Sequence, residues 1–223
     1  MRNTAIILAG GAGKRFNNSV PKQFLYLENR RIIDYSVNTF SNHKDINDII
    51  IVCNNDWIKI IKEEYPNYNI IAGGKTRQES SLLGLQYCNK ETQNVLLHDA
   101  ARPFINVEYI TKSIQLLEKY EAVNISIPLS DTMIIAKKNI IHSIPSRENV
   151  YLSQTPQSFR YKTILNAHKN CKELNLTDDI QLVNNLNIDC YNLEGSPNNI
   201  KITHENDLDI GRLILKNKMK EKV

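Results

Sequence analysis

The feature that most constrains the fold is a regular alternation of short apolar runs with segments of helical periodicity. The runs that suit strands lie at residues 5–8, 49–53, 69–71, 95–98, 122–128, 189–193 and 200–203. Helical spacing is found at residues 32–40, 57–65, 82–87, 109–120, 162–172, 178–186 and 206–216. Strands that alternate with helices indicate a mostly parallel sheet with helices on both faces. We therefore predict an α/β fold.

One segment interrupts this alternation. Residues 130–151 carry five isoleucines around a Lys-Lys-Asn turn, a pattern that predicts a β-hairpin. An isolated hairpin is only marginally stable in water, so its isoleucines need a cover. We expect this arm to pack on a second subunit; the alternative is that it folds back on its own domain. The chain of 223 residues otherwise suits a single domain, 1–223.

Composition narrows the kinds of partner. The formal net charge is +4, and charges of both signs are interspersed. This balance suits an anionic small molecule and is too weak to predict nucleic acid binding. The four cysteines include no C-x-x-C pair, so neither a zinc site nor a disulfide framework is predicted. No apolar run reaches the roughly 18 residues of a membrane span, and no signal peptide is present, so we expect a cytoplasmic protein.

The first strand candidate ends in a cationic glycine loop, LAGGAGKR at residues 8–15, which PKQF follows at 21–24. Glycines let backbone N–H groups approach an anion closely, and Lys14, Arg15 and Lys22 would neutralise it. The loop matches neither G-x-G-x-x-G nor the P-loop, so neither a dinucleotide site nor a Walker site is predicted. We interpret it as a nucleoside triphosphate site; the alternative is a glycine turn with solvated lysines.

The strand candidate at 95–98 is followed by Asp99 and Arg102. A carboxylate at a strand end near phosphates suits Mg²⁺, and arginine offers a planar fork for a second phosphate. The alternative is that Asp99 only caps the next turn. We interpret His98 as structural, because an ionised phosphate needs no general base to attack phosphorus.

Two further segments complete the predicted site. GGKTRQESS at 73–81 runs into a helix whose free N–H groups could hold a nucleobase or ribose, unless Thr76 or Ser80 is simply an N-cap. Lys201 alternates with Ile200 and Ile202, so it could lie above the site or in solvent. Ligands bind at the carboxyl ends of parallel strands, so we expect the loops after 5–8, 69–71 and 95–98 to form one site.

Taken together, the motifs resemble those of the IspD/TarI cytidylyltransferases, which act on 2-C-methyl-D-erythritol 4-phosphate or ribitol 5-phosphate. The motifs are, in order, LAGGAGKRF, PKQF, GGKTRQESS, HDAARPF, SDT, QTPQSF, LTDD and NIKIT. The resemblance covers essentially the whole chain. It implies a Rossmann-like, mostly parallel sheet, a homodimer formed through a β-arm, and transfer of CMP from CTP to a polyol phosphate with Mg²⁺.

The resemblance also implies roles for individual residues. It implies catalytic roles for Arg15, Lys22 and Lys201. It implies nucleotide contacts by Leu8, Ala9, Gly10, Gly11, Gly13, Lys14, Gly73, Arg77, Ser80 and Asp99, with Asp99 also holding the metal. It implies contacts to the acceptor by Ala100, Arg102, Asp131, Arg147, Thr177 and Lys201, with Arg147 entering from the partner subunit.

The arm distinguishes the two acceptors in this resemblance. Ser146 precedes Arg147 where the methylerythritol phosphate enzymes usually carry Asp, and Tyr151 stands where they carry Trp. Those enzymes also tend to read DTxK, whereas Met133 and Ile134 follow the Asp-Thr pair here. We therefore predict ribitol 5-phosphate as the acceptor, with 2-C-methyl-D-erythritol 4-phosphate as the alternative. A non-catalytic nucleotide-binding module is a further alternative, and the lack of G-x-G-x-x-G disfavours an oxidoreductase.

Overall fold

A seven-stranded sheet forms the centre of the molecule, with the strand order β11-β7-β10-β6-β1-β4-β5. The computed structural model describes residues 1–11, 20–171, 173 and 176–220. The strands are β1 (Asn3–Ala9), β4 (Asp48–Cys53), β5 (Asn69–Ala72), β6 (Asn94–Asp99), β7 (Ala122–Pro128), β10 (Tyr151–Arg160) and β11 (Cys190–Glu194). β1 pairs in parallel with β4 and β6, whereas β10 runs antiparallel to β6 and β7. The predicted α/β fold with a mostly parallel sheet is confirmed.

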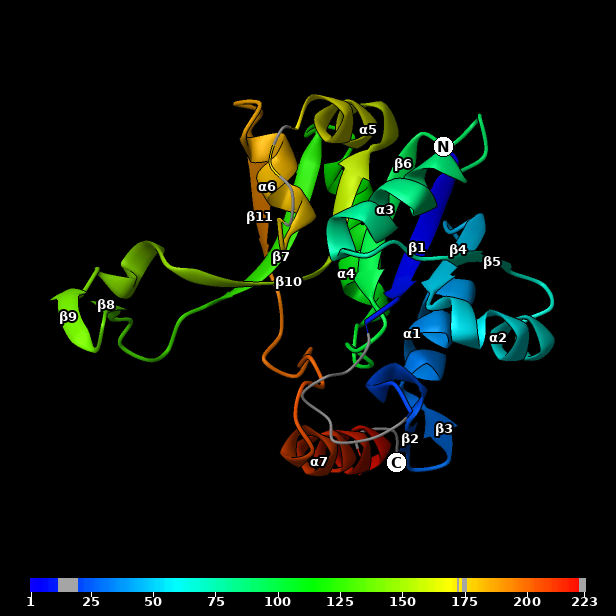
Figure 1. Ribbon diagram of the computed structural model, residues 1–223, viewed down its shortest axis with the longest axis horizontal. Helices are drawn as coiled ribbons and strands as arrows, with labels where there is room; N and C mark the ends of the chain where they lie inside the picture. The colour runs from blue at the N-terminus through cyan, green and yellow to red at the C-terminus, as the bar shows by residue number, and fades with distance from the viewer. Residues whose placement is uncertain (12–19, 172, 174–175, 221–223) are drawn as a thin grey trace.

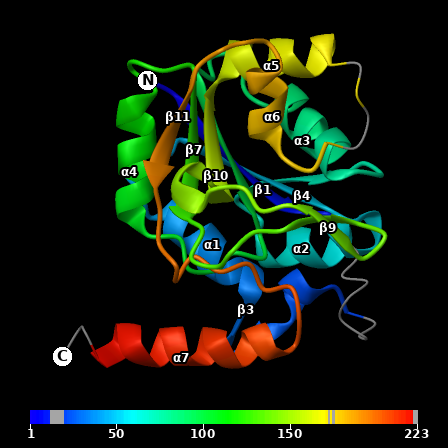
Figure 2. The same cartoon turned by 90° about the vertical axis from the view of Figure 1, so that its left-hand side faces the viewer.

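Helices cover both faces of this sheet (Figures 1 and 2). They are α1 (Ile32–Ser41), α2 (Ile58–Glu64), α3 (Arg77–Gln86), α4 (Val107–Leu116), α5 (Tyr161–Asn170), α6 (Asp179–Asn184) and α7 (Asn206–Lys220). Figure 2 shows α1, α2 and α4 on one side of the sheet and α3, α5 and α6 on the other.

The alternation of side chains along β1 explains the two layers. Ile7 faces the cluster that contains Phe40 of α1, and Ile6 faces the cluster that contains Leu85 of α3. All four side chains are fully buried. Each such burial stabilises the fold by roughly 1.5–3 kcal/mol, so a strand that is apolar on both faces must lie in the middle of the sheet.

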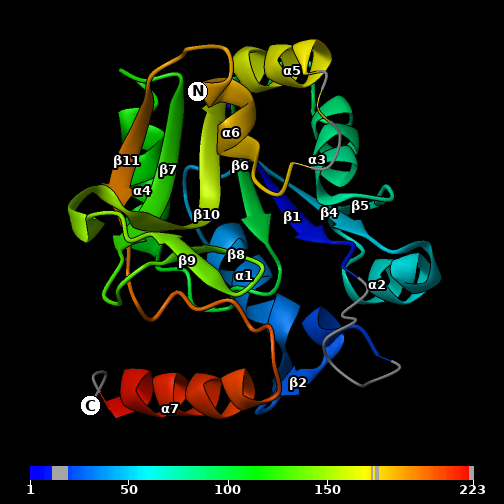
Figure 3. The same cartoon turned by 60° about the vertical axis from the view of Figure 1, so that its left-hand side comes forward.

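The C-terminal helix α7 lies apart from these layers, beside a short hairpin of β2 (Tyr26–Leu27) and β3 (Arg30–Arg31) (Figure 3). Leu27 of the hairpin, Phe104 and Ile214 of α7 form a third buried cluster. Gly211 gives α7 room for this contact, since a Cβ there would lie 3.2 Å from both methyl carbons of Leu27. The cluster closes the end of the molecule at which β1 and β6 terminate.

The predicted arm is a hairpin of β8 (Ile135–Lys137) and β9 (Ile140–Ser143), and it projects away from the sheet (Figure 1). Lys138 and Asn139 form its turn, both with positive φ, as two-residue hairpin loops require. The arm does not fold back on the sheet: its five isoleucines are each 51–68 % exposed, and Ile140 is the most exposed of them. No helix in the described ranges is long and apolar enough to cross a membrane.

One predicted strand is wrong, and one observed strand was not predicted. Residues 200–203 form no strand: among the described residues, one backbone hydrogen bond ties them to a neighbouring segment, from Ile202 N–H to the Ala101 carbonyl at 2.8 Å. The strand β10 was not predicted, because its buried side chains include Gln154, Thr155 and Gln157 and it contains a proline. Proline is tolerated at bulges, and the pairing of β10 with β7 shifts between Gln154 and Ser158.

Candidate active site

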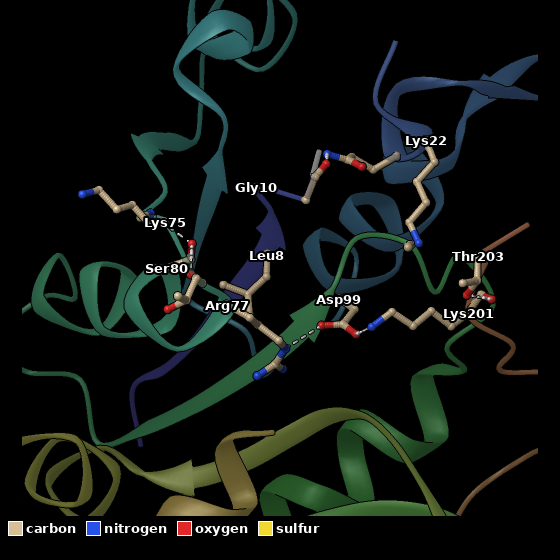
Figure 4. Close-up of a pocket in the computed structure, with 14 residues that line it drawn as sticks. Leu8, Gly10, Lys22, Lys75, Arg77, Ser80, Asp99, Lys201 and Thr203 are labelled. Atoms are coloured by element: carbon tan, nitrogen blue, oxygen red, sulfur yellow. Dashed lines mark hydrogen bonds and ion pairs between the residues drawn. The ribbon is translucent and has the colours of Figure 1, made fainter. Parts of the chain in front are cut away.

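A cavity of about 440 Å³ opens at the carboxyl ends of β1 and β6 (Figure 4). Its lining residues are Leu8, Gly10, Gly11, Lys22, Gln23, Gly74, Lys75, Thr76, Arg77, Ser80, Asp99, Ala101, Lys201 and Thr203. The three loops expected to meet, those after β1, β5 and β6, therefore do meet. The described lining carries four cations and a single carboxylate, although Figure 4 shows the Lys75 side chain directed away from Asp99. The volume is in the range of a small-molecule site. The cavity is suited to an anion.

The glycine turn before α3 is shaped by Ser80. Its hydroxyl accepts a hydrogen bond from Gly74 N–H at 3.0 Å and donates to the Thr76 carbonyl at 2.9 Å. A side chain at Gly74 is excluded, since its Cβ would lie 2.3 Å from the Glu79 side chain. Thr76 is the N-cap, accepting from Glu79 N–H at 3.1 Å. Thr76 is therefore an N-cap, one of the alternatives that the sequence left open. Ser80 stabilises the turn through its hydrogen bonds and also lines the cavity.

Asp99 is the electrostatic centre of the cavity. Its Oδ2 accepts from Lys201 Nζ at 2.6 Å, and its Oδ1 accepts from Arg77 Nε at 3.2 Å (Figure 4). Burial alone would raise the pKa of Asp99, but Arg77, Lys201 and Arg102 together hold it well below its usual range. The carboxylate thus stays ionised throughout the physiological pH range.

Arg77 lies between two carboxylates, Asp99 and Asp179. Asp179 is the first residue of α6 and is almost fully buried, with His168 of α5 at 3.6 Å. Burial would lower the pKa of Arg77, but Asp179 and Asp99 raise it above its usual value. The guanidinium is therefore a fixed charge, held in place by side chains from two distant parts of the sequence.

Lys201 reaches the cavity without a strand. Ile202 is fully buried in the cluster beneath α7, and the alternation of side chains turns Lys201 the other way, to Asp99. Thr203 N–H then donates to Asp207 Oδ2 at 2.6 Å, at the start of α7. Figure 4 shows Lys22 directed toward the same space as Asp99 and Lys201.

Several predicted site residues lie outside the lining of the cavity. Ala9, Gly73 and Ala100 are the backbone neighbours of lining residues, and the two alanines are buried. Arg102 is turned away, donating to the carbonyls of Asn199 at 2.8 Å and Ser153 at 3.2 Å. Beneath it, His98 Nε2 donates to the Arg102 carbonyl at 3.0 Å, which fits the structural role expected of His98.

The predicted acceptor residues are dispersed in the single chain. Asp131 and Arg147 belong to the arm, where Arg147 Nη1 donates to the Ser130 carbonyl at 2.7 Å. Thr177 is exposed and comes two residues before Asp179, the partner of Arg77. Gly13, Lys14 and Arg15 lie outside the described residues.

Seven residues of the site were not among the predicted site residues. They are Gln23, Gly74, Lys75, Thr76, Ala101 and Thr203 in the described lining, and Asp179 behind Arg77. Gln23 and Asp179 stand inside the quoted motifs PKQF and LTDD. Their neighbours Lys22 and Thr177 were predicted instead, because positively charged side chains and hydroxyl groups are the usual contacts to phosphate. Membership of a quoted motif was the available signal, since all of the missed residues stand inside one.

The described residues contain no group of three or more His, Cys, Asp and Glu side chains arranged to hold a metal ion. Asp99 is the one carboxylate among the described lining residues. Mg²⁺ is commonly bound by one or two carboxylates, with phosphate oxygens and water as the other ligands. A carboxylate has about four lone-pair sites, of which Lys201 and Arg77 use two. The donor set fits a metal that arrives with a triphosphate and takes one protein ligand.

Known proteins resemble this chain over nearly its whole length. Residues 3–217 match the family model of IspD, 2-C-methyl-D-erythritol 4-phosphate cytidylyltransferase. An enzyme of that name from Clostridium botulinum is 39 % identical over 96 % of this chain and 97 % of its own, and one from Clostridioides difficile is 34 % identical over 99 % and 96 %.

The solved structures agree. The crystal structure of 4-diphosphocytidyl-2C-methyl-D-erythritol synthase from Anaerococcus prevotii has a TM-score of 0.84 and 30 % identity, with 96 % of both chains covered. The Francisella tularensis 2-C-methyl-D-erythritol 4-phosphate cytidylyltransferase also has a TM-score of 0.84, with 26 % identity over 96 % of this chain and 100 % of that one.

These relatives overturn the predicted preference for ribitol 5-phosphate, since all those named above are methylerythritol phosphate enzymes. The features behind that preference lie on the arm. Ser146 is the N-cap of the short helix η3 (Arg147–Asn149), accepting from Glu148 N–H at 3.4 Å. Ser and Asp are nearly equivalent as N-caps, so this difference preserves a turn and says nothing of the acceptor.

The mostly parallel sheet agrees with the solved structures, both of which have a TM-score of 0.84. The family match covers far more than half of the chain, and the relatives exceed 30 % identity over almost all of it. The chain belongs to the IspD family and is a cytidylyltransferase that uses CTP.

Proposed function

We propose that this protein transfers CMP from CTP to 2-C-methyl-D-erythritol 4-phosphate and releases pyrophosphate. The main support is the meeting of Lys22, Arg77, Asp99 and Lys201 at one cavity. The acceptor is inferred from the names of the relatives, which share the chain's full length. A nucleotide-binding module without catalytic activity is disfavoured. Nucleotide binding alone does not require a buried carboxylate whose two oxygens accept hydrogen bonds from a lysine and an arginine.

The reaction joins two anions. A phosphate oxygen of the acceptor attacks the α-phosphorus of CTP in line, a new P–O bond forms, and the bond from the α-phosphorus to the bridging oxygen breaks. Pyrophosphate leaves with the electron pair. The main barrier is charge repulsion together with the charge that develops in the transition state, and preorganised cations offset both. Positioning also matters, because the step is bimolecular.

We assign the charge-stabilising roles to Lys22 and Lys201, and also to Arg15, which lies outside the described residues. Lys22 follows Pro21 on the short helix η1 (Lys22–Phe24), and its side chain enters the cavity. Lys201 is fixed by Asp99 at 2.6 Å. Gly10 and Gly11 line the cavity, where their backbone can approach the nucleotide closely. The N–H groups of Gly73 and Gly74 are instead used on the Cys53 carbonyl at 2.8 Å and on Ser80 Oγ at 3.0 Å.

Asp99 is the residue that would hold Mg²⁺. A bound divalent cation would neutralise triphosphate charge and stabilise the leaving pyrophosphate. Asp99 contributes by staying ionised, because Arg77 and Lys201 keep its pKa low. Arg77 in turn keeps the carboxylate in one orientation through its second ion pair, with Asp179.

The arm is proposed to serve a homodimer. Its isoleucines are exposed in one chain, and Arg147 on the same segment lies away from the cavity lining. A second copy could cover the isoleucines and bring its Arg147 to the acceptor phosphate, with Thr177 as a further acceptor contact. A cytoplasmic location stays a prediction from the sequence.

The decisive experiment incubates the protein with CTP, Mg²⁺ and one polyol phosphate at a time, and measures pyrophosphate release. We expect turnover with 2-C-methyl-D-erythritol 4-phosphate and a kcat/KM at least ~10²-fold lower with ribitol 5-phosphate, the discrimination available from a few mispaired polar groups. Nucleotide binding without pyrophosphate from any acceptor would instead support the module without catalytic activity.

A further inference from the structure

Gln23 is a buried amide that joins two segments of the nucleotide site. It is 2 % exposed and lies between Lys22 and Phe24 on η1. Its Nε2 donates to the Ala9 carbonyl at 2.5 Å and to the Gly11 carbonyl at 3.0 Å. Both hydrogens of one amide are therefore used on two carbonyls of the glycine loop.

The scaffold behind Gln23 is rigid. Phe24 stacks on Trp57 with ring centroids 4.5 Å apart and is 2 % exposed. The turn is closed by Phe24 N–H donating to the Pro21 carbonyl at 2.9 Å. A side chain mounted on such a turn has few conformations to lose, so its two hydrogen bonds act to fix the loop rather than to fix Gln23.

The carbonyls of Ala9 and Gly11 need a hydrogen-bond donor because their oxygens carry partial negative charge close to the proposed phosphate site. Ala9 is the last residue of β1, and Gly10 and Gly11 line the cavity. A carbonyl oxygen with no donor would place partial negative charge beside the phosphates. In a trans peptide the carbonyl and the following N–H point in opposite directions, so holding the Ala9 carbonyl also sets the direction of Gly10 N–H.

We propose that Gln23 is a positioning residue for the triphosphate of CTP. It neutralises and orients the carbonyls of Ala9 and Gly11, and it ties the loop to the turn that carries Lys22. The proposal rests on the proposed nucleotide site and goes beyond it, because Gln23 acts through the backbone of the loop.

The test compares Gln23→Met, which keeps the length of the side chain and loses both donors, with Gln115→Met on the exposed face of α4. CTP with Mg²⁺ is titrated into each variant in a calorimeter without an acceptor. We expect Kd for CTP to rise at least ~10-fold for Gln23→Met, the equivalent of one to two lost hydrogen bonds. Gln115→Met should bind as the wild type does.

Steady-state kinetics separate positioning from general damage. KM for CTP should rise in parallel with Kd, while KM for the acceptor stays within about twofold, because the proposed acceptor contacts lie elsewhere. If Gln23→Met does not fold, Gln23→Glu is measured instead. This variant keeps the shape of the side chain but replaces Nε2 by a carboxylate oxygen that faces both carbonyls, so its loss of CTP affinity should be larger.

An unchanged Kd for CTP in the folded variant would overturn the proposal, as would equal increases in both KM values. The acceptor assignment can fail independently: a wild type that binds CTP but releases no pyrophosphate with 2-C-methyl-D-erythritol 4-phosphate would refute that assignment. The ratio of CTP affinities between Gln23→Met and the wild type would still decide the role of Gln23.

Discussion

Asp99 is the residue on which the chemistry of the cavity converges. It is 7 % exposed, and a buried carboxylate is costly unless it is paired. Lys201 and Arg77 supply the pairing, and Thr155 Oγ1 accepts from its backbone N–H at 3.1 Å. The side chain and backbone of this residue are thus both fixed before any substrate enters.

Removal of a lysine should therefore affect turnover more than folding. We expect Lys201→Ala, and separately Lys22→Ala, to lower kcat by about 10²-fold or more, the usual loss when a preorganised stabilising charge is removed. The measurement is pyrophosphate release at saturating substrates. Lys44→Ala, an exposed lysine after α1, serves as the control and should keep full activity. Near-normal turnover of both Lys201→Ala and Lys22→Ala would refute their catalytic roles.

His98 gives the protein a pH-dependent stability. Burial lowers the pKa of His98 to about 4, from an ordinary value near 6.5. Below about pH 6.5 the unfolded chain binds a proton at this position and the folded chain does not. The contribution of His98 to the free energy of unfolding is therefore full above 6.5 and is lost as the pH falls toward 4.

Urea denaturation between pH 4 and 8 tests this. As the pH falls from 6.5 to 4, protonation linked to His98 should lower the free energy of unfolding of the wild type by up to about 1.4 kcal/mol per pH unit. His98→Gln should show a correspondingly shallower slope, whereas His142→Gln, on the exposed arm, should keep the slope of the wild type. Equal slopes for wild type and His98→Gln would contradict the assignment.

Among the elements, β10 connects the sheet to the site. Gln157 of β10 is fully buried, and its Oε1 accepts from the N–H groups of Asp179 at 3.1 Å and Ile180 at 3.3 Å. Its Nε2 donates to Asn124 Oδ1 at 3.0 Å. The strand therefore fixes the start of α6, and with it the carboxylate of Asp179 that holds Arg77.

Substitution of this glutamine should destabilise the fold. Gln157→Met leaves the buried N–H of Asp179 without its partner, whereas Ile180 N–H keeps Asp178 Oδ1 and Asn124 Oδ1 keeps Ser153 Oγ. We therefore expect a loss of about 1–3 kcal/mol in the free energy of unfolding. Equilibrium urea unfolding measures it. Gln115→Met on the exposed face of α4 should change stability by less than about 0.5 kcal/mol. A Gln157→Met protein as stable as that control would show that α6 does not depend on β10.

The sequence predicted those strands whose own pattern of apolar residues determines their place in the sheet. β1, β4 and β6 are apolar on both faces, so their sequence alone indicates central strands. β10 could not be found this way, since Gln157 and Ser158 are buried through hydrogen bonds and packing that the other strands provide. Residues 200–203 alternate as a strand does, yet no neighbouring strand extends far enough to pair with them.

At the scale of the whole molecule, the projecting arm is notable because its apolar side chains are exposed in a single chain. Ile140 and Ile141 are 68 % and 56 % exposed on β9. Apolar patches of this kind mark interaction sites on soluble proteins. The proposed homodimer would bury them.

We expect Ile140→Ser with Ile141→Ser to shift the protein from dimer to monomer in sedimentation velocity, without a change in circular dichroism. The matched control is Ile210→Ser with Leu213→Ser on α7, whose side chains are 47 % and 61 % exposed. This control should remain dimeric. A monomeric wild type, or an arm variant that stays dimeric, would rule out the arm as the interface.

The sequence by itself determined the α/β class, most strands and helices, the glycine loops and the resemblance to cytidylyltransferases. These depend on the periodicity, the glycines and the charges of short segments, and such local properties can be recognised from the sequence alone. The tertiary structure alone decided that Asp179 holds Arg77 and that Gln23 holds the glycine loop. Arg77 and Asp179 are 102 positions apart, and only the packing of strand ends brings such distant groups into contact.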